Sequence, residues 1–428
     1  MNGWADIRAE LDRIRPACAW PDGRTFRENV KHVVLLSSSS RGGSSVLAEY
    51  LRSSRAMLHL RGELNAFLAL HGLGHPDSGT GSDALGAEHV DARADAFAYE
   101  LATDIGRPAL GTGDPRDYLA ALRYRLRLQW PHVAIEPDVL GDAFERAPAP
   151  LGSDAFHAVL LSALAERTEI HPDLYDLSAS LVRGLAPRLG TRAGPPGPAI
   201  LEEPPFVCTV PWELATPGDL EHLPLLLKTP SNAYRLPFFE RLFPNARVRV
   251  LHLTRNPAAS INGLFDGWRY PRGFFSHDLG LQLDIQDYTR TAGPWSGRWW
   301  KFDLPPGWRD QVARPLAQVA AFQWLAAHRA IFDFTATQHD VLRIAFEDLL
   351  GLDARGTLDG LFRWLGIEPD APIAQRTVGQ MPHVMVTDQP RARRWFERQA
   401  IIEPVLSRPD VMETAVRLGY KSDPSTWE

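Results

Sequence analysis

Residues Ser37–Ser45, with the sequence SSSSRGGSS, combine hydroxyls, glycines and one arginine in a stretch that can wrap around an anion. The stretch follows the apolar run HVVLLS and precedes a segment with helical spacing, so it lies between a predicted strand and a predicted helix. Glycines let backbone N–H groups approach a phosphate, hydroxyls donate hydrogen bonds, and a helix N-terminus adds positive potential. A flexible strand-to-helix turn has the same composition, and the Gly-Lys-Ser or Gly-Lys-Thr of a nucleotide triphosphatase is absent from this loop.

Two further cations stand at the ends of predicted strands. Lys228 closes the run LPLLLK, and Arg255 follows the run VRVLHL. Taken alone, Lys228 reads as a solvated lysine, and Asn256 and Pro257 after Arg255 are ordinary helix-start residues. Three strand ends that each deliver a cation and a helix start to one sheet edge favour an anion site there.

The elements that must position these residues alternate between strands and helices. Apolar runs, three of which contain β-branched residues, predict four strands, and a helical segment follows each of them. This alternation predicts an α/β fold with a central parallel sheet flanked by helices. The predicted strands are residues 32–37, 223–228, 248–253 and 341–346.

The chain is predicted to form one domain, residues 1–428, with distinct segments inside it. Residues 88–195 have mostly helical spacing and are interpreted as a large helical insertion. Residues 72–87, rich in Gly, Ser and Asp, are expected to form a mobile loop. Residues 266–310 contain a cluster of tryptophans and phenylalanines that could form an acceptor wall or pack against the sheet.

Composition excludes several classes of protein. A net charge of -6 and a pI near 6.2 argue against a nucleic-acid partner. Cys18 and Cys208 are far apart and lack metal-ligand spacing, so no metal site is expected and a reducing compartment is indicated. No signal peptide is evident, and no apolar run approaches the ~20 residues that span a bilayer. We therefore expect a cytoplasmic protein without a membrane partner.

The ordered blocks HVVLLSSSSRGGSSV, LPLLLKTP, FPNARVRVLHLTRNPAASI and LRIAFEDLL resemble the sulfotransferases that use 3′-phosphoadenosine 5′-phosphosulfate (PAPS), especially the bacterial and carbohydrate-type branches. The resemblance implies a P-loop-like sulfotransferase fold. It also implies transfer of a sulfuryl group from PAPS to a hydroxyl, or an amide nitrogen, of a small molecule, sugar or natural product.

The resemblance implies roles for individual residues. Lys228 matches the lysine that bridges the leaving phosphate and the sulfuryl oxygen, and Arg255 matches the arginine that holds the 3′-phosphate. Ser260 is a substitute for the family's serine, whose usual place is taken by Gly263. Val46 replaces an aromatic residue that stacks on adenine in many members. The residues that match the 5′-phosphosulfate loop are Arg41, Gly42, Gly43, Ser44 and Ser45.

The general base also follows from the resemblance. Pro230 occupies the position of the catalytic histidine of aryl and steroid sulfotransferases, so the base must come from elsewhere. Glycan and bacterial members use a glutamate shortly after the first helix, and Glu63 lies at about that distance. A helix-start acid is the ordinary reading of Glu63. The reserve candidates are Glu202, Glu203 and His277.

The late basic segment Arg391, Arg393 and Arg394 either closes over the 3′-phosphate, as in many relatives, or forms a solvated helix. Two alternative functions fit the same scaffold. One is a non-catalytic nucleotide-binding module, and the other is a nucleotide-dependent phosphotransferase, which the missing Gly-Lys-Ser/Thr loop argues against. The sequence specifies neither the acceptor nor an oligomeric state.

Overall fold

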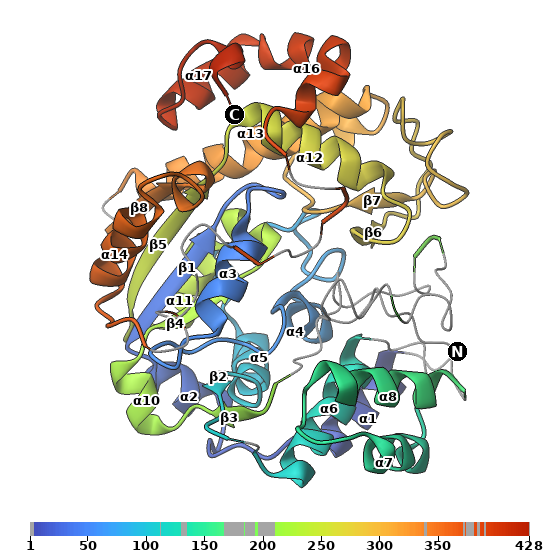
Figure 1. The fold of residues 1–428 in the computed structure, drawn as a ribbon, viewed down its shortest axis with the longest axis vertical. Coiled ribbons are helices and arrows are strands. Elements are labelled where there is room, and N and C mark those ends of the chain that lie inside the picture. The colour runs from blue at the N-terminus through green and yellow to red at the C-terminus, as the bar shows by residue number, and fades with distance from the viewer. Residues whose placement is uncertain are drawn as a thin grey trace.

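A parallel four-stranded sheet forms the centre of the computed structural model (Figure 1). The strand order is β4-β1-β5-β8, and each neighbouring pair is parallel. The expected α/β class with a central parallel sheet flanked by helices is therefore confirmed. The strands are β1 (His32–Ser37), β4 (Leu225–Lys228), β5 (Arg247–Thr254) and β8 (Asp340–Ala345). The structure describes residues 4–111, 113–129, 135–166, 184, 193–195, 210–337, 340–370, 373, 381–382, 386–388 and 391–427.

The strand boundaries differ slightly from the sequence prediction for local reasons. β4 begins at Leu225 because Leu223 is the C-terminal cap of helix α10 (Pro217–His222). β8 ends at Ala345 because Phe346 opens the 3₁₀ turn η5 (Phe346–Leu349). The registers pair Leu36 with Lys228 on one side of β1 and with Leu251 on the other.

Alternating strand residues bury both faces of the sheet, as a parallel sheet between helices requires. Val33 and Leu35 of β1 face a core that contains residues of helices α2, α4, α5, α11 and α13. Val34 and Leu36 face the opposite core, formed with helices α3 and α14. These helices are α2 (Gly23–Asn29), α3 (Ser44–Arg52), α4 (Asn65–Leu70), α5 (Ala92–Ala102), α11 (Leu236–Leu242), α13 (Leu316–Thr335) and α14 (Ala354–Leu365).

The remaining described elements extend the two ends of this sandwich (Figure 1). Helices α12, α16 and α17 and part of α13 share a third core with the aromatic segment, which also carries the antiparallel pair of β6 and β7. Helices α6, α7 and α8 form a fourth cluster, and α1 contacts α6. Their bounds are α1 (Trp4–Ile14), α6 (Pro115–Gln129), α7 (Pro137–Arg146), α8 (Asp154–Ala165), α12 (Pro257–Arg269), α16 (Gln399–Leu406), α17 (Pro409–Arg417), β6 (Phe275–Asp278) and β7 (Trp299–Lys301).

The described part of residues 88–195 contains α5, α6, α7 and α8, together with a short strand, β2 (Gly106–Pro108). β2 pairs with β3 (Trp212–Leu214), and α5 packs tightly against α2. The division into a domain and an insertion remains a prediction. In the part of the chain that the structure describes, no helix is both long and apolar enough to cross a membrane.

Candidate functional site

A cavity of about 980 Å³ opens where the strands of the central sheet end. Residues that follow β1, β4, β5 and β8 all contribute to its wall, which is the edge where open α/β sheets bind ligands. Its volume lies within the range of small-molecule and cofactor sites. The sequence-predicted residues that line the cavity are Arg41, Gly43, Ser44, Ser45, Glu63, Lys228, Arg255, His277, Arg391, Arg393 and Arg394.

The loop of residues 38–43, called here the β1–α3 loop, is shaped by its glycines. Gly43 caps α3 in the left-handed region at φ 95°, and a Cβ there would lie 2.3 Å from the Phe346 ring. Gly42 donates its N–H to the Ser39 carbonyl (3.0 Å), which closes a tight turn. Gly42 itself does not line the cavity. The backbone at Gly43 can thus pass close to an aromatic ring that also faces the cavity.

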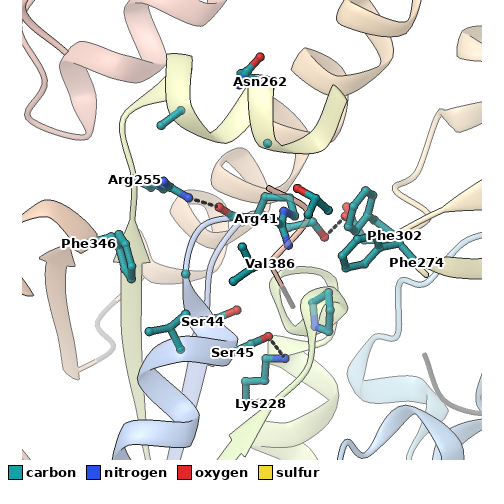
Figure 2. A pocket seen from close by; sticks show the side chains of 18 of the residues that line it. Arg41, Ser44, Ser45, Lys228, Arg255, Asn262, Phe274, Phe302, Phe346 and Val386 are labelled. Carbon is teal, nitrogen blue, oxygen red and sulfur yellow. Dashed lines mark hydrogen bonds between the residues drawn. The ribbon is translucent and has the colours of Figure 1, made fainter. Parts of the chain in front are cut away.

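Three arginines on the cavity wall lie close enough to affect one another. Burial, helped by Arg255 and Arg394, lowers the pKa of Arg41 to about 10. Burial also lowers the pKa of Arg255, and Arg394 adds to this effect while Glu347 opposes it. Arg255 donates to the Arg41 carbonyl (3.3 Å), as Figure 2 shows. Guanidinium groups that disfavour one another's charge in this way are well placed to receive an anion.

Lys228 contacts both the first turn of α3 and Glu63, the base predicted from the sequence. Its Nζ donates to Ser45 Oγ (2.8 Å) and to Glu63 Oε1, and the two charged side chains are 9% and 4% exposed. Lys228 ends β4, while Glu63 stands two residues before the start of α4. The structure therefore places the predicted leaving-group cation and the predicted base in direct contact, next to the first turn of α3.

A second group of charged residues lines the side of the cavity near β6. Asp83 accepts from Ser231 Oγ (2.6 Å) and the Leu304 N–H (2.9 Å), and lies 3.4 Å from Arg235 and 3.5 Å from His277. Burial raises the pKa of Asp83, but His277, Arg235 and Ser231 outweigh burial and hold the pKa well below its usual range. His277 is thus paired with a carboxylate in the cavity wall.

Ser260 and Gly263, the two residues that sequence analysis related to the family's serine, lie in different environments. Ser260 is fully buried, does not line the cavity and donates to the Arg255 carbonyl (3.5 Å). Gly263 does line the cavity, and a Cβ there would lie 3.3 Å from the Cβ of Arg41. The glycine therefore makes room for Arg41. Glu202 and Glu203 lie outside the residues that the structure describes.

The aromatic segment divides between core and cavity. Trp268, Trp300 and Trp308 are buried in the core shared with α12 and α13. Phe274 and Phe302 line the cavity, where their rings stack with centroids 4.6 Å apart. Some aromatic residues of this segment therefore pack in the core, and others line the cavity.

The late basic segment, with Arg391, Arg393 and Arg394, forms a part of the cavity wall that comes from the C-terminal part of the chain. Arg394 pairs with Asp266 of α12, and Arg398 shares the same carboxylate at 2.7 Å. Arg391 pairs with Glu397. The segment is therefore held against α12 by ion pairs, with Arg394 at the start of η6 (Arg394–Arg398).

Sequence analysis missed several cavity residues. Asp83 belongs to the stretch expected to be a mobile loop, and its turn-rich neighbours gave no sign of burial. Asn65 accepts hydrogen bonds from Thr229 (2.9 Å) and Arg235 (2.5 Å), which no local pattern indicates. Phe346 had a detectable signal, because it directly follows a strand at the same sheet edge.

Comparison with known proteins leaves the family open. No family model matches the chain, and a search of curated proteins finds no match. Among solved structures, the sulfotransferase domain from the Synechococcus PCC 7002 olefin synthase aligns with a TM-score of 0.36 and 16% identity, covering 92% of this chain and 96% of that one. The sulfotransferase domain from the curacin biosynthetic pathway gives a TM-score of 0.37 and 11% identity, covering 92% and 99%. Likenesses this distant carry no argument about function.

Replacing Gly43 by alanine should destabilise the protein more than the same change at Gly79. Both glycines have positive φ (95° and 80°), so each variant meets the left-handed penalty of ~1–2 kcal/mol. Only at Gly43 does the new methyl meet a ring, while nothing lies within 4 Å of the added Cβ at Gly79. Overpacking should add ~1–3 kcal/mol to the loss, measured by denaturant unfolding. Equal losses would mean that the contact with Phe346 does not constrain the loop.

Proposed function

We propose that this protein is a sulfotransferase that moves a sulfuryl group from PAPS to a hydroxyl, or an amide nitrogen, of a small molecule, sugar or natural product. The observation that carries the proposal is the contact of Lys228 with both Ser45 and Glu63, in a cavity that also holds clustered arginines. A cation for the leaving group, a carboxylate for the proton and a second anion site are the parts that this reaction needs.

The arginine cluster supports two anion positions. We assign the 5′-phosphosulfate to the β1–α3 loop and the first turn of α3, whose free N–H groups and hydroxyls suit an anion. We assign the 3′-phosphate to Arg255, with Ser260 acting from behind through the Arg255 carbonyl. The residues assigned to the phosphosulfate are Arg41, Gly42, Gly43, Ser44 and Ser45, among which Gly42 shapes the turn, because its N–H is donated to the Ser39 carbonyl.

Phe346 is our candidate for the adenine wall that Val46 does not provide. Its ring lines the cavity and lies against Gly43. The Arg255 guanidinium lies 5.2 Å from the centroid of this ring. Val46 and Leu350 line the same cavity. A base stacked there would stay near the arginine assigned to its 3′-phosphate, and aromatic rings favour such stacking.

In the proposed reaction the acceptor oxygen attacks sulfur, the bond between sulfur and the phosphate oxygen breaks, and the acceptor proton passes to Glu63. Glu63 then loses its negative charge, so its hold on Lys228 weakens. The Lys228 ammonium is thereby released to neutralise the charge that develops on the departing phosphate oxygen. One contact between two side chains would thus couple proton removal to leaving-group stabilisation.

Arg255→Ala tests the donor assignment. A hydrogen-bonded charge contact contributes ~1.5–3 kcal/mol, so the affinity for 3′,5′-bisphosphoadenosine should fall roughly 10- to 100-fold. Binding of adenosine 5′-monophosphate, which lacks the 3′-phosphate, should change little. Titration calorimetry with both nucleotides gives the ratio.

Arg269→Ala is the matched control, because Arg269 lies on α12 but does not line the cavity. If Arg255→Ala weakens both nucleotides equally, Arg255 supports the loop, and the 3′-phosphate is read elsewhere, with Arg391 and Arg394 next. Preference of the wild type for ATP-Mg would point to a phosphotransferase. Bisphosphate binding without turnover on any acceptor would point to a binding module.

Lys228→Ala should lower turnover at least ~10²-fold while changing product-nucleotide affinity less than about tenfold, because the lysine acts mainly as the phosphate leaves. Steady-state rates and nucleotide titration separate the two effects. Lys31→Ala, just before β1 at the opposite end of the sheet, serves as the control. Near-normal turnover of Lys228→Ala would remove Lys228 from the mechanism.

Glu63→Gln should lose turnover by ~10²–10⁴-fold yet retain nucleotide binding, because the amide can still accept from Lys228 but cannot take up a proton. His277→Ala is the comparison, since His277 lines the same cavity and is paired with Asp83. Single-turnover rates at saturating donor measure both variants. An active Glu63→Gln with an inactive His277→Ala would transfer the base assignment to His277.

A further inference from the structure

Strained backbone gathers at one place in the cavity wall. In the described part of the chain, five residues other than glycine have positive φ, and four of them line the cavity. Such conformations are costly for residues with a Cβ and persist only where the surrounding structure enforces them. Three of the four, Arg41 (64°), Phe274 (65°) and Phe302 (62°), are in contact.

These three residues connect the β1–α3 loop to the aromatic segment. The Arg41 guanidinium lies 5.1 Å from the centroid of the Phe274 ring, and Phe274 stacks on Phe302. The N–H of Phe302 donates to the Phe274 carbonyl at 3.3 Å. Figure 2 shows Arg41 beside this pair of rings. The position of Arg41 therefore depends on the position of a segment more than two hundred residues away.

Asp303, which follows Phe302, provides the bond that closes this arrangement. Its carboxylate accepts hydrogen bonds from Ser40 Oγ and from Tyr234 OH (2.7 Å), and the residue is 1% exposed. The Asp303 carbonyl is fixed in turn by Trp300 Nε1 (2.9 Å) and Gln323 Nε2 (2.8 Å). The carboxylate of a firmly held residue thus accepts a hydrogen bond from Ser40, the residue directly before Arg41.

We propose that Asp303 is a positioning residue, which holds Ser40 so that the β1–α3 loop keeps Arg41 in its left-handed conformation over Phe274. The part of this proposal that concerns the donor rests on the proposed function, because Arg41 is assigned there to the phosphosulfate. A hydrogen bond to a charged group is strong enough to offset one residue in the left-handed region. Breaking it should let the loop relax.

The hydrogen bond between Ser40 and Asp303 depends on the charge of the Asp303 carboxyl group. Burial raises its pKa to about 6, against the opposing effect of the Ser40 and Tyr234 hydrogen bonds, and Asp83 raises it further. The charged groups that face it are Asp83 and Arg235, and the titratable group is Tyr234, whose pKa is itself raised by burial. An ionised carboxylate accepts from both hydroxyls, whereas a protonated one must use an oxygen to donate. These hydrogen bonds favour the ionised form, but burial outweighs them, so the contribution of Asp303 to holding the loop falls as pH rises through about 6.

The test compares Asp303→Asn and Ser40→Ala with Tyr124→Phe. Tyr124 OH donates to the buried carboxylate of Glu100, so the control breaks the same kind of bond away from the cavity. Hydrogen exchange of peptides covering residues 38–45 should become roughly 10- to 100-fold faster in the first two variants and stay unchanged in the control. The dissociation constant for 3′,5′-bisphosphoadenosine should rise by a similar factor.

Two further readouts separate positioning from general stability. The double variant of Ser40 and Asp303 should bind the nucleotide no more weakly than the weaker single variant, because both changes break one bond. After correction for intrinsic exchange, wild-type protection of residues 38–45 should decrease between pH 5 and 7, because opening the loop lets the Asp303 pKa fall from about 6 towards its ordinary value. Asp303→Asn should lack this dependence. Should Asp303→Asn fail to fold, Ser40→Ala carries the same expectation, since it removes one hydroxyl.

Unchanged exchange of residues 38–45 in Ser40→Ala overturns the proposal whether or not a nucleotide binds. Additive losses of nucleotide affinity in the double variant also overturn it. Faster exchange in the variants, in a protein whose wild type binds no bisphosphate nucleotide, refutes the proposed function instead. That second result leaves Asp303 established as the residue that holds the loop.

Discussion

Charged side chains removed from water must find partners, and this requirement governs how the cavity region is assembled. Lys228 meets Glu63, and Asp83 meets Arg235 and His277. The partners come from β4, from the segment before α4, from the irregular stretch at residues 72–87, from the N-cap of α11 and from β6. None of these charges can be buried until the separate segments have closed on one another. The cavity wall is therefore a product of the whole fold rather than of any one element.

The sheet and its strand ends were predictable from sequence because both leave local signals. An apolar run followed by turn residues indicates a buried strand, and parallel strands necessarily present their carboxyl ends at one edge. Lys228 and Arg255 stand directly at such ends, so their convergence on the cavity follows from topology. The β1–α3 loop was recognisable for the same reason, since its glycines and serines follow a strand.

The remaining cavity residues had no such signal, because their roles depend on pairings across the chain. Asp303 and Asp83 occur in irregular segments where an aspartate usually caps a turn. Their burial results from hydroxyl and amide donors supplied by Ser40, Tyr234, Ser231 and Leu304. Ser260 shows the opposite case. Its sequence position suggested a ligand contact, but the turn of α12 directs it into the core behind Arg255.

The register of the central sheet sets how far apart the ends of its strands lie along the cavity. Leu36 of β1 is level with Lys228 on one side and with Leu251 on the other, so Arg255 lies four residues further along its strand direction than Lys228. At ~3.3 Å of rise per residue, that offset corresponds to about 13 Å, and β1 separates the two strands laterally. The offset between the two backbone positions is thus set by the hydrogen bonds of the sheet and changes in steps of one residue. Side-chain changes in the cavity can alter which group is bound and how far each cation reaches, whereas the distance between the two backbone positions changes only with a shift of strand register.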